Sequence, residues 1–344
     1  MNRGPVRIGL VGYGFGGRRF HAPLIAAAAG AELAGVVTRS PERRAELEDD
    51  HPGTPAFDTL TDLAAAGAEA VAISTPADTH MPLLHEAVGL GLAVVVDKPF
   101  ALDADAGRAA VEAARRAGVV LSVYQNRRWD SDLLTVRRLL DRGELGDLVR
   151  FESAFERFDR AAPPASGGGI LRDFGSHLVD QALLLFGPVA SVYAELLERP
   201  EHGGLDHGFF AALRHRGGTI SHLAGNWTEG APAPRFRVTG TDGSYVVDGM
   251  DGQEAALIAG RSPATEGDRW GVEPEARWGV LQRGDAREPV PSERGRWDTY
   301  YPAFAAAVRG EGPVPVDPRD AVASLNVIDA IRTSAAKRRA VEVG

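Results

Sequence analysis

Short apolar runs alternate with helical segments along the first third of the chain. The runs are rich in Val and Ile and apolar throughout, which is typical of parallel strands buried on both faces of a sheet. Strands that alternate with helices predict βαβ units with right-handed crossovers, and therefore an α/β domain on a doubly wound parallel sheet. The predicted strands are 6–11, 33–38, 70–74, 93–96 and 119–123.

Helix signals between these runs support the same architecture. Ser40 can cap a helix whose first residue is Pro41. Asp103 can cap a second helix through Arg116, because Gly118 stands just beyond that end. Both helices fall between predicted strands, as the βαβ pattern requires.

After about residue 125 the pattern changes to strands joined by short turns that contain glycine. Such turns join antiparallel neighbours, so we expect an α+β domain with a large, mostly antiparallel, open-faced sheet. Residues 259–297 are polar and rich in Gly, Pro and Arg, and we expect long surface loops there. The predicted strands are 148–155, 189–198, 206–214, 218–227, 234–240 and 243–248, and the predicted helices are 131–141, 173–186 and 317–337.

The chain of 344 residues therefore divides into two domains, over 1–124 and 125–344. We leave open whether the last helix, at about 317–337, packs back on the first domain. A hydrophobic fraction of 44% and a charged fraction of 25% are ordinary for a soluble globular protein.

Charge and composition exclude several functions. The net charge of −9, with no long run of either sign, argues against nucleic acid as a partner. The absence of cysteine excludes disulfides, thiol catalysis and Cys-ligated metals. No apolar stretch reaches about 18 residues, so we expect no membrane span. The first strand leaves no room for a signal peptide, and we expect a cytoplasmic protein.

The first predicted strand leads directly into Gly12-Tyr13-Gly14-Phe15-Gly16-Gly17, and a helix follows from about Arg18. Gly12 allows a tight turn, Gly14 lets the backbone approach a pyrophosphate, and Gly17 lets helix and strand pack closely. The helix N-terminus offers N–H groups to the phosphates. The alternative is a plain strand–turn–helix corner without a ligand. We expect a dinucleotide here, with Tyr13 and Phe15 also at the cofactor.

The second strand ends in Thr38-Arg39-Ser40, about 20 residues past the last glycine of the turn. Sites for NAD usually hold an acidic residue there, which binds the ribose 2′-hydroxyl. That carboxylate is missing, whereas Arg39 offers a planar fork for a 2′-phosphate and its neighbours add hydroxyl groups. An ordinary helix cap is the alternative. We therefore predict NADP as the cofactor, with NAD as a second choice.

Two further segments follow strands at the same predicted edge of the sheet. Thr75-Pro76 and His80 would line the cofactor crevice there, although a structural turn is as good an interpretation. Asp97-Lys98 follows the next strand, and the Lys98 ammonium could stabilise charge on a substrate oxygen. A solvated lysine at a strand end is the alternative.

Asp173 and His177 lie four residues apart, so on a helix they share one face. A carboxylate beside an imidazole orients the ring and suits it for general-base catalysis. A capping aspartate at a helix N-terminus is the alternative. Asp180 and Gln181 extend the polar edge of the same helix, and Gly167–Gly169 before it could let the chain pass close to a ligand.

The strand over 119–123 is followed by several polar residues, among them Asn126 and Arg127. These could bind a polyhydroxylated ligand or solvate a domain junction. The histidines of the strand-rich half show no metal-ligand spacing, so we predict structural roles for them and no metal site. They are His202, His207, His215 and His222.

Taken together, these motifs resemble the glucose–fructose oxidoreductase / inositol dehydrogenase (Gfo/Idh/MocA) family over essentially the whole chain. The ordered set is far more specific than any single motif. Asp97 replaces the family's usual Glu, which changes the reach toward the nicotinamide ribose and leaves Lys98 in place. The matching motifs are Gly12/Gly14/Gly17, Thr75-Pro76 with His80, Asp97-Lys98-Pro99, and Gly167–Gly169 with Asp173 and His177. The stretches 20–24, 122–130 and 251–254 resemble the NADP-dependent scyllo-inositol dehydrogenase branch.

The resemblance implies an NADP(H)-dependent oxidoreductase acting on a secondary alcohol of a cyclic polyol or sugar. His177 would take the hydroxyl proton as hydride leaves the same carbon for nicotinamide C4, Asp173 would orient His177, and Lys98 would steady the oxygen. Asn126 and Arg127, with these three, are the predicted substrate contacts. A reductase of sugars or small ketones and a non-catalytic ligand sensor remain alternatives. The resemblance also implies a homodimer or homotetramer formed through the C-terminal sheet.

Overall fold

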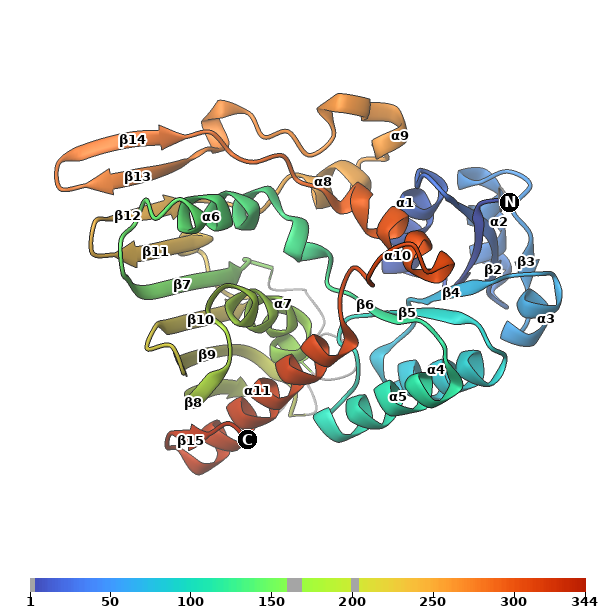
Figure 1. Cartoon of the computed structure of the whole chain (residues 1–344), viewed down its shortest axis with the longest axis horizontal. Coiled ribbons are helices and arrows are strands. Elements are labelled where there is room, and N and C mark those ends of the chain that lie inside the picture. The colour runs from blue at the N-terminus through green and yellow to red at the C-terminus, as the bar shows by residue number, and fades with distance from the viewer. Residues whose placement is uncertain (1–3, 160–168, 199–203) are drawn as a thin grey trace. The chain divides into compact units, whose positions relative to one another are not determined.

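In the computed structural model, residues 4–159, 169–198 and 204–344 are described (Figure 1). The chain forms two compact units. The first unit takes in Met1–Asn126, Gln253–Trp270 and Arg296–Val322. The second unit takes in Arg127–Gly252, Gly271–Gly295 and Ala323–Gly344.

The first unit is built on a parallel six-stranded sheet with the strand order β3-β2-β1-β4-β5-β6. This is the order of doubly wound dinucleotide-binding folds, and it reverses between β1 and β4. Ligands of such folds bind at the carboxyl ends of the strands near that reversal. The strands are β1 Val6–Val11, β2 Ala31–Val37, β3 Ala56–Phe57, β4 Ala70–Ile73, β5 Ala93–Asp97 and β6 Leu121–Tyr124.

Helices cover both faces of this sheet, with α4 and α5 on one side and α1 and α10 on the other (Figure 1). The strands β1, β4, β5 and β6 are almost wholly buried, which explains their continuous apolar runs. The helices are α1 Ala22–Ala26, α2 Pro41–Asp50, α3 Leu60–Ala65, α4 His80–Gly89, α5 Ala104–Ala117, α8 Gln253–Ile258, α9 Pro263–Glu266 and α10 Tyr300–Arg309, with a π-helical turn over Gly17–His21.

Both predicted helix caps are confirmed. The Ser40 hydroxyl accepts a hydrogen bond from the Arg43 N–H at 3.3 Å, at the start of α2. The Asp103 carboxylate accepts one from the Ala106 N–H at 2.8 Å, at the start of α5. Gly118 ends α5 with a φ of +66°, a conformation that glycine adopts without strain. The local signals in the sequence therefore set these helix ends.

The second unit is built on a nine-stranded sheet with the order β14-β13-β12-β11-β7-β10-β9-β8-β15. Among the described strands of this sheet, only β7 and β10 pair in parallel, so its predicted antiparallel character is confirmed. The strands are β7 Leu148–Glu156, β8 Val189–Glu198, β9 Asp206–His215, β10 Ile220–Asn226, β11 Phe236–Gly240, β12 Gly243–Val247, β13 Gly279–Arg283, β14 Ala286–Val290 and β15 Val341–Glu342.

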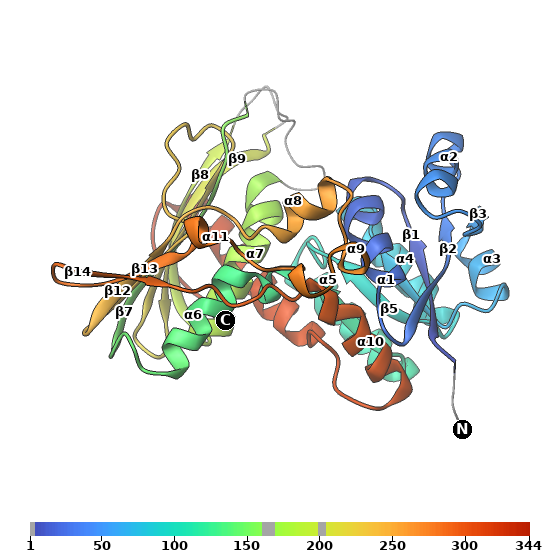
Figure 2. The same ribbon diagram turned by 90° about the horizontal axis from the view of Figure 1, so that it is seen from above.

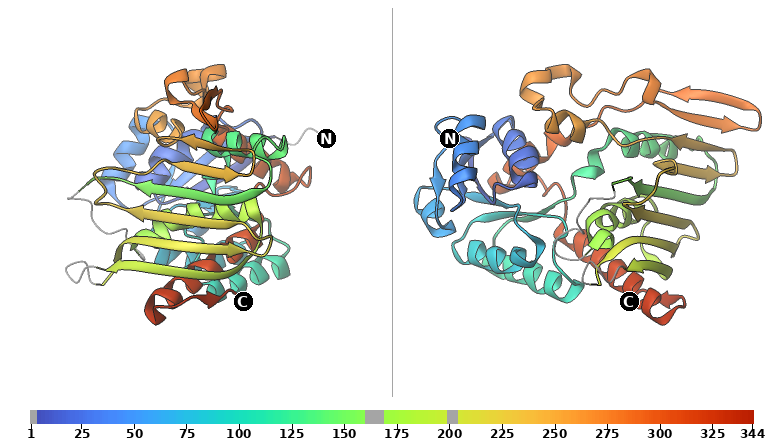
Figure 3. Two further views of the ribbon diagram at one scale, coloured as in Figure 1. Left: turned by 90° about the vertical axis from the view of Figure 1, so that its left-hand side faces the viewer. Right: turned by 180° about the vertical axis from the view of Figure 1, so that it is seen from behind.

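One face of this sheet carries the core of the second unit. Figure 2 shows the sheet close to edge-on, with α6 and α7 on one side. Apolar side chains of α7 pack there against Phe151, Phe209 and Leu223 of three strands. No described helix covers the opposite face, which Figure 3 shows in its left view. The helices are α6 Ser131–Asp141, α7 Gly169–Phe186 and α11 Pro318–Lys337, the last of which begins in the first unit.

The prediction of long loops over 259–297 is wrong. Part of that segment forms the hairpin β13–β14, joined at Gly284, whose φ is +59°. Leu281 and Val290 are buried in the hairpin, but most of its other side chains are exposed and polar. An edge hairpin with so little apolar surface lacks the alternation that identifies a strand. No helix among the described residues is long and apolar enough to cross a bilayer.

Candidate active site

The three glycines of the turn after β1 differ in what surrounds them. Gly12 has a φ of +94°, and a Cβ there would lie 2.5 Å from the Ser74 carbonyl oxygen. A Cβ on Gly17 would lie 2.1 Å from the Gly12 carbonyl oxygen. A Cβ on Gly14 would meet no atom within 4 Å. Gly17 is therefore required by the turn itself and Gly12 by its φ and by the neighbouring Ser74 carbonyl, whereas Gly14 leaves open space that fits the close approach of a dinucleotide pyrophosphate.

The side chain of Tyr13 is buried and points to α2. Its hydroxyl donates to Asp50 Oδ2 at 3.1 Å, and Arg18 Nε donates to the same oxygen at 2.6 Å. Burial and the Asp50 charge raise the pKa of Tyr13 well above its usual range. A contact of Tyr13 with a cofactor would therefore involve its backbone. Phe15 is exposed and makes an edge contact with Phe20.

The three residues after β2 include one cationic side chain, Arg39, and no carboxylate. Arg39 is exposed, and Ser40 caps α2, so Ser40 fills the capping role that was the alternative interpretation. Thr38 Oγ1 accepts the Ser40 N–H at 3.4 Å. The hydroxyls of Thr38 and Ser40 thus shape the start of α2, and the Arg39 guanidinium lies at the surface beside it.

His80 braces the loops that follow β4 and β5. Its Nε2 lies 2.9 Å from the Thr75 carbonyl oxygen, and its Nδ1 lies 2.9 Å from the Pro99 carbonyl oxygen. The ring is buried, and each of its two nitrogens contacts a backbone carbonyl oxygen. The Thr75 and Thr79 hydroxyl oxygens lie 2.6 Å apart and close the turn through Pro76. His80 therefore connects the segments that follow β4 and β5, both of which we predicted at the cofactor.

The Asp97 carboxylate is held by three polar contacts within the first unit. Its Oδ2 accepts from Ser74 Oγ at 2.9 Å and lies 3.1 Å from His21 Nε2. Its Oδ1 accepts the Lys98 N–H at 2.7 Å. Burial alone would raise the pKa of Asp97, but His21, followed by Lys98 and His80, holds it at about 2. His21 and Ser74 are the residues in this group that we did not predict at the site.

Lys98 also stands out in the composition. The chain has 38 Lys and Arg residues, and only Lys98 and Lys337 are lysines. A protein that uses arginine for nearly every cation carries a compact ammonium directly after a buried strand, and an ammonium suits proton and oxygen chemistry better than a guanidinium. This scarcity is a sequence signal for position 98 that motif reasoning did not use.

Helix α7 begins at Gly169, one turn earlier than predicted. Asp206 of β9 accepts the Leu171 N–H at 2.6 Å and is itself bound by Arg332 at 2.9 Å. Gly169 has a φ of +80°, and a Cβ there would lie 2.3 Å from Asp206 Oδ1. Gly169 therefore approaches Asp206, while Gly167 and Gly168 lie outside the described residues. Asp173 falls inside the helix, so it is not its N-cap.

His177 lies four residues after Asp173 on α7, in buried surroundings. Phe155 and Phe174 stack with ring centroids 3.9 Å apart, and the His177 ring centroid lies 6.5 Å from that of Phe155. Helical spacing places Asp173 and His177 on one face. The sequence-predicted pair is thus on one helix, with an aromatic wall beside the imidazole.

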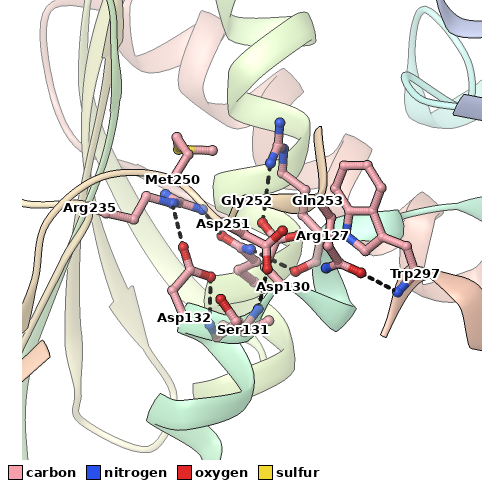
Figure 4. A network of polar contacts seen from close by, with 12 residues as sticks. Arg127, Asp130, Ser131, Asp132, Arg235, Met250, Asp251, Gly252, Gln253 and Trp297 are labelled. Carbon is pink, nitrogen blue, oxygen red and sulfur yellow. Dashed lines mark hydrogen bonds and ion pairs between the residues drawn. The ribbon is translucent and has the colours of Figure 1, made fainter. Parts of the chain in front are cut away.

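A buried polar network includes Arg127, Asp132 and Arg235 of the second unit (Figure 4). Gln181, four residues after His177 on α7, binds to it. Gln181 Nε2 donates to the Arg127 carbonyl at 3.0 Å, and Arg235 donates to Gln181 Oε1 at 2.7 Å. Arg235 Nε also lies 3.5 Å from Asp132 Oδ2. Burial raises the pKa of Asp132 to about 6, although Arg235 opposes the shift. Together these contacts fix α7 to the segment after residue 126.

Arg127 belongs to this network. Its guanidinium pairs with Asp130 at 3.2 Å and lies 5.0 Å from the Phe155 ring centroid. The neighbouring Arg128 binds Asp180 through two hydrogen bonds, at 2.8 and 2.6 Å. These contacts favour a structural role for both arginines, and the assignment of Arg127 to the substrate stays a prediction. Asn126, also predicted at the substrate, is buried in the first unit.

The histidines set aside as structural lie in the second unit. His215 binds the Gly187 carbonyl and the Ser221 hydroxyl, each at 2.8 Å. His222 packs beside Phe210 on the sheet. His207 is buried, and His202 lies outside the described residues.

A parallel doubly wound sheet with a glycine turn after its first strand, together with an α+β unit, is an architecture found among nucleotide-dependent oxidoreductases. Residues 6–125 match the model of the oxidoreductase family with an NAD-binding Rossmann fold, and residues 133–246 match the GFO/IDH/MocA C-terminal domain. The chain belongs to the Gfo/Idh/MocA oxidoreductase family, which confirms the resemblance.

Relatives match it over nearly full length. The oxidoreductase YdgJ of Escherichia coli is 38% identical over 97% of each chain. The scyllo-inositol 2-dehydrogenase (NADP(+)) IolW of Bacillus subtilis is 31% identical over 98% of this chain and 95% of its own. The solved structure of the YPO2259 putative oxidoreductase from Yersinia pestis superposes with a TM-score of 0.91 at 35% identity, covering 99% of this chain and 98% of that one.

Proposed function

We propose that the protein is an NADP(H)-dependent dehydrogenase that interconverts a secondary alcohol and a ketone on a cyclic polyol or a sugar. The observation that carries the proposal is Lys98, directly after β5, on a turn that the Asp97 carboxylate anchors. Ligands of doubly wound sheets bind at that edge. The relative from Bacillus subtilis, named for scyllo-inositol and NADP(+), supports this substrate class and cofactor.

The residues after β2 support NADP over NAD. Thr38-Arg39-Ser40 holds no carboxylate that would bind a ribose 2′-hydroxyl and repel a 2′-phosphate. We assign Arg39 and Ser40 to the 2′-phosphate and the backbone of the Gly12–Gly17 turn to the pyrophosphate. When bound, the nicotinamide supplies the hydride chemistry.

The protein's own residues handle the proton and the charge on oxygen. We assign His177 to take the hydroxyl proton of the alcohol, so that the O–H and C–H bonds break as the C=O bond forms. Asp173, on the same face of α7, orients the imidazole. The Lys98 ammonium stabilises the negative charge that develops on the oxygen. In the reductive direction the same groups return the proton. Asn126 and Arg127 remain assigned to hydroxyl groups of the substrate.

Absorbance at 340 nm tests the proposal directly. The protein is assayed with NADP and with NAD against a panel of inositols and sugars, and with NADPH and NADH against the matching ketoses. We expect turnover with at least one cyclic polyol or sugar and a higher kcat/KM with NADP than with NAD. No turnover across the panel in either direction would overturn the proposal.

We also propose a homo-oligomer formed through the face of the nine-stranded sheet that no described helix covers. Tyr193, Leu197 and Phe210 are exposed there on two paired strands. Apolar side chains grouped on a sheet face are typical of an interface. Light scattering at the assay concentration should give a mass of at least twice 36.5 kDa, and a monomer would contradict the proposal.

A further inference from the structure

His21 ends the π-helical turn that follows the glycines, and its side chain is completely buried. The imidazole lies between two polar groups of the first unit. Nε2 is 3.1 Å from Asp97 Oδ2, and Nδ1 is 2.5 Å from the Tyr301 hydroxyl oxygen. Tyr301 belongs to α10 and is buried as well. A residue beside the cofactor turn is thus bound to the residue that precedes Lys98.

Chemistry assigns the protons of this chain of contacts. An ionised carboxylate only accepts, so Nε2 carries the proton that points to Asp97. In the neutral ring Nδ1 is then an acceptor, and the Tyr301 hydroxyl donates to it. Tyr301 therefore fixes both the tautomer and the orientation of His21. Without that hydroxyl the ring could turn or change tautomer and lose its bond to Asp97.

Asp97 lies next to two parts of the predicted site, the Lys98 backbone and the glycine turn, so its position affects both. Its other oxygen accepts the Lys98 N–H at 2.7 Å, so the carboxylate holds the lysine backbone. Its Oδ2 lies 3.2 Å, and the Ser74 hydroxyl 2.8 Å, from the position that a Cβ on Gly16 would take. No side chain fits between the glycine turn and this group. The Asp97 carboxylate therefore binds the lysine backbone and lies beside Gly16 of the glycine turn.

We propose that His21 is a positioning residue that, braced by Tyr301, fixes Asp97 and through it the backbone of Lys98. The inference rests on the proposed function, because it assumes that Lys98 meets the substrate oxygen. Positioning of this kind matters because a displacement of about 1 Å in a catalytic group can cost on the order of 10²-fold in rate.

Substitutions of His21, Tyr301 and Tyr300 test this role. His21→Leu removes the donor, His21→Gln keeps an N–H donor on a side chain of similar reach, and Tyr301→Phe removes only the hydroxyl. Tyr300→Phe is the matched control, because that equally buried hydroxyl donates to Ser122 at 3.0 Å. We expect kcat to fall about tenfold or more in His21→Leu and less in His21→Gln and Tyr301→Phe, with KM for NADP nearly unchanged. Tyr300→Phe should keep the wild-type kcat.

The scarcity of lysine provides a readout that needs no turnover. Reductive methylation with ¹³C-formaldehyde labels the two lysines and the N-terminus, and Lys337→Arg identifies the signal of Lys98. We expect that signal to shift or broaden in His21→Leu and Tyr301→Phe, while the Lys337 signal and the Tyr300→Phe spectrum stay unchanged. If His21→Leu does not fold, Tyr301→Phe decides the question alone.

The outcomes separate this inference from the proposed function. An unchanged Lys98 signal and an unchanged kcat in both Tyr301→Phe and any folded His21→Leu variant would overturn the inference, even if Lys98→Met abolishes turnover. If Lys98→Met keeps the wild-type kcat, the proposed function fails, whatever the His21 variants do to the lysine signal.

Discussion

The Asp206 carboxylate accepts the Leu171 backbone N–H at 2.6 Å and so caps the first turn of α7 from a neighbouring strand. Arg332 binds the same carboxylate, which is almost completely buried. We expect Asp206→Ala to lower the free energy of unfolding by about 2 kcal/mol, because a capping bond and a charge-assisted hydrogen bond with Arg332 are both lost. Urea unfolding measures the change.

Glu288→Ala is the control for that experiment. Glu288 is exposed, lies in the same unit and forms a loose pair with Arg283 at 3.9 Å, so its loss should change stability by less than about 0.5 kcal/mol. Equal effects of the two substitutions would contradict the capping role of Asp206.

The glycine turn allows ligand binding and folding to be separated. Gly14→Ala places a Cβ in open space, so stability should stay within about 0.5 kcal/mol of wild type while NADP affinity falls. Gly17→Ala drives a Cβ into the Gly12 carbonyl and should cost about 1–3 kcal/mol of stability. Calorimetric titration with NADP and urea unfolding measure the two effects. A Gly14→Ala protein with wild-type affinity would mean that no pyrophosphate lies on this turn.

A site residue could be predicted from the sequence where the contacts that require it involve residues close to it in the chain. The positive φ of Gly12 and the contact of Gly17 with the Gly12 carbonyl arise within one turn, and the spacing of Asp173 and His177 follows from helix geometry. The partner of His21 could not be predicted, because Tyr301 is 280 residues further along the chain.

Elements of the fold also differ in whether they depend on residues nearby or far away in the chain. The first turn of α7 is bound by a side chain of β9 that lies 35 residues further along the chain, and no pattern local to the helix predicts that contact. The hairpin β13–β14 is held as an edge of the sheet by pairing with β12, whereas its own residues carry few apolar positions. Five strands of the parallel sheet, in contrast, carry their own apolar pattern and were predicted within a few residues, whereas the two-residue edge strand β3 was missed.

Arg39 should decide the preference for the phosphorylated cofactor. A charge-assisted hydrogen bond contributes about 1.5–3 kcal/mol, so Arg39→Ala should lower kcat/KM for NADP by about 10–100-fold and leave the value for NAD nearly unchanged. Arg115→Ala removes an exposed arginine that pairs with Glu112 on α5, and it should alter neither value. Steady-state kinetics with both cofactors make the comparison, and an unchanged NADP/NAD ratio in Arg39→Ala would remove Arg39 from the phosphate.

Asp97 should make stability depend on acid pH. Its pKa is about 2 in the folded protein against an ordinary 3.8, because His21 and then Lys98 and His80 outweigh the effect of burial. The folded state therefore holds this proton more weakly than the unfolded state. The resulting stabilisation, about 2 kcal/mol, is complete above about pH 4 and is lost as the pH falls through about 2.

Asp97→Asn removes that titration. We expect the variant to be less stable than wild type by about 2 kcal/mol at pH 7, with a gap that narrows between about pH 4 and pH 3. Urea unfolding across this range gives the gap, and Asp105→Asn on the exposed surface of α5 should show none. A gap of constant size from pH 7 to pH 3 would show that the Asp97 charge does not contribute in this way.

His177 should carry the proton transfer. General-base catalysis contributes about 10²–10⁴-fold, so His177→Ala should lower kcat by that order while NADP affinity, measured by calorimetry, stays near wild type. The loss of the base should also remove the acidic limb of the kcat–pH profile, because a neutral imidazole is the form that accepts the proton. His85→Ala, on the exposed side of α4, is the control and should keep the wild-type profile. A His177→Ala enzyme with unchanged kcat would exclude this histidine from the proton transfer.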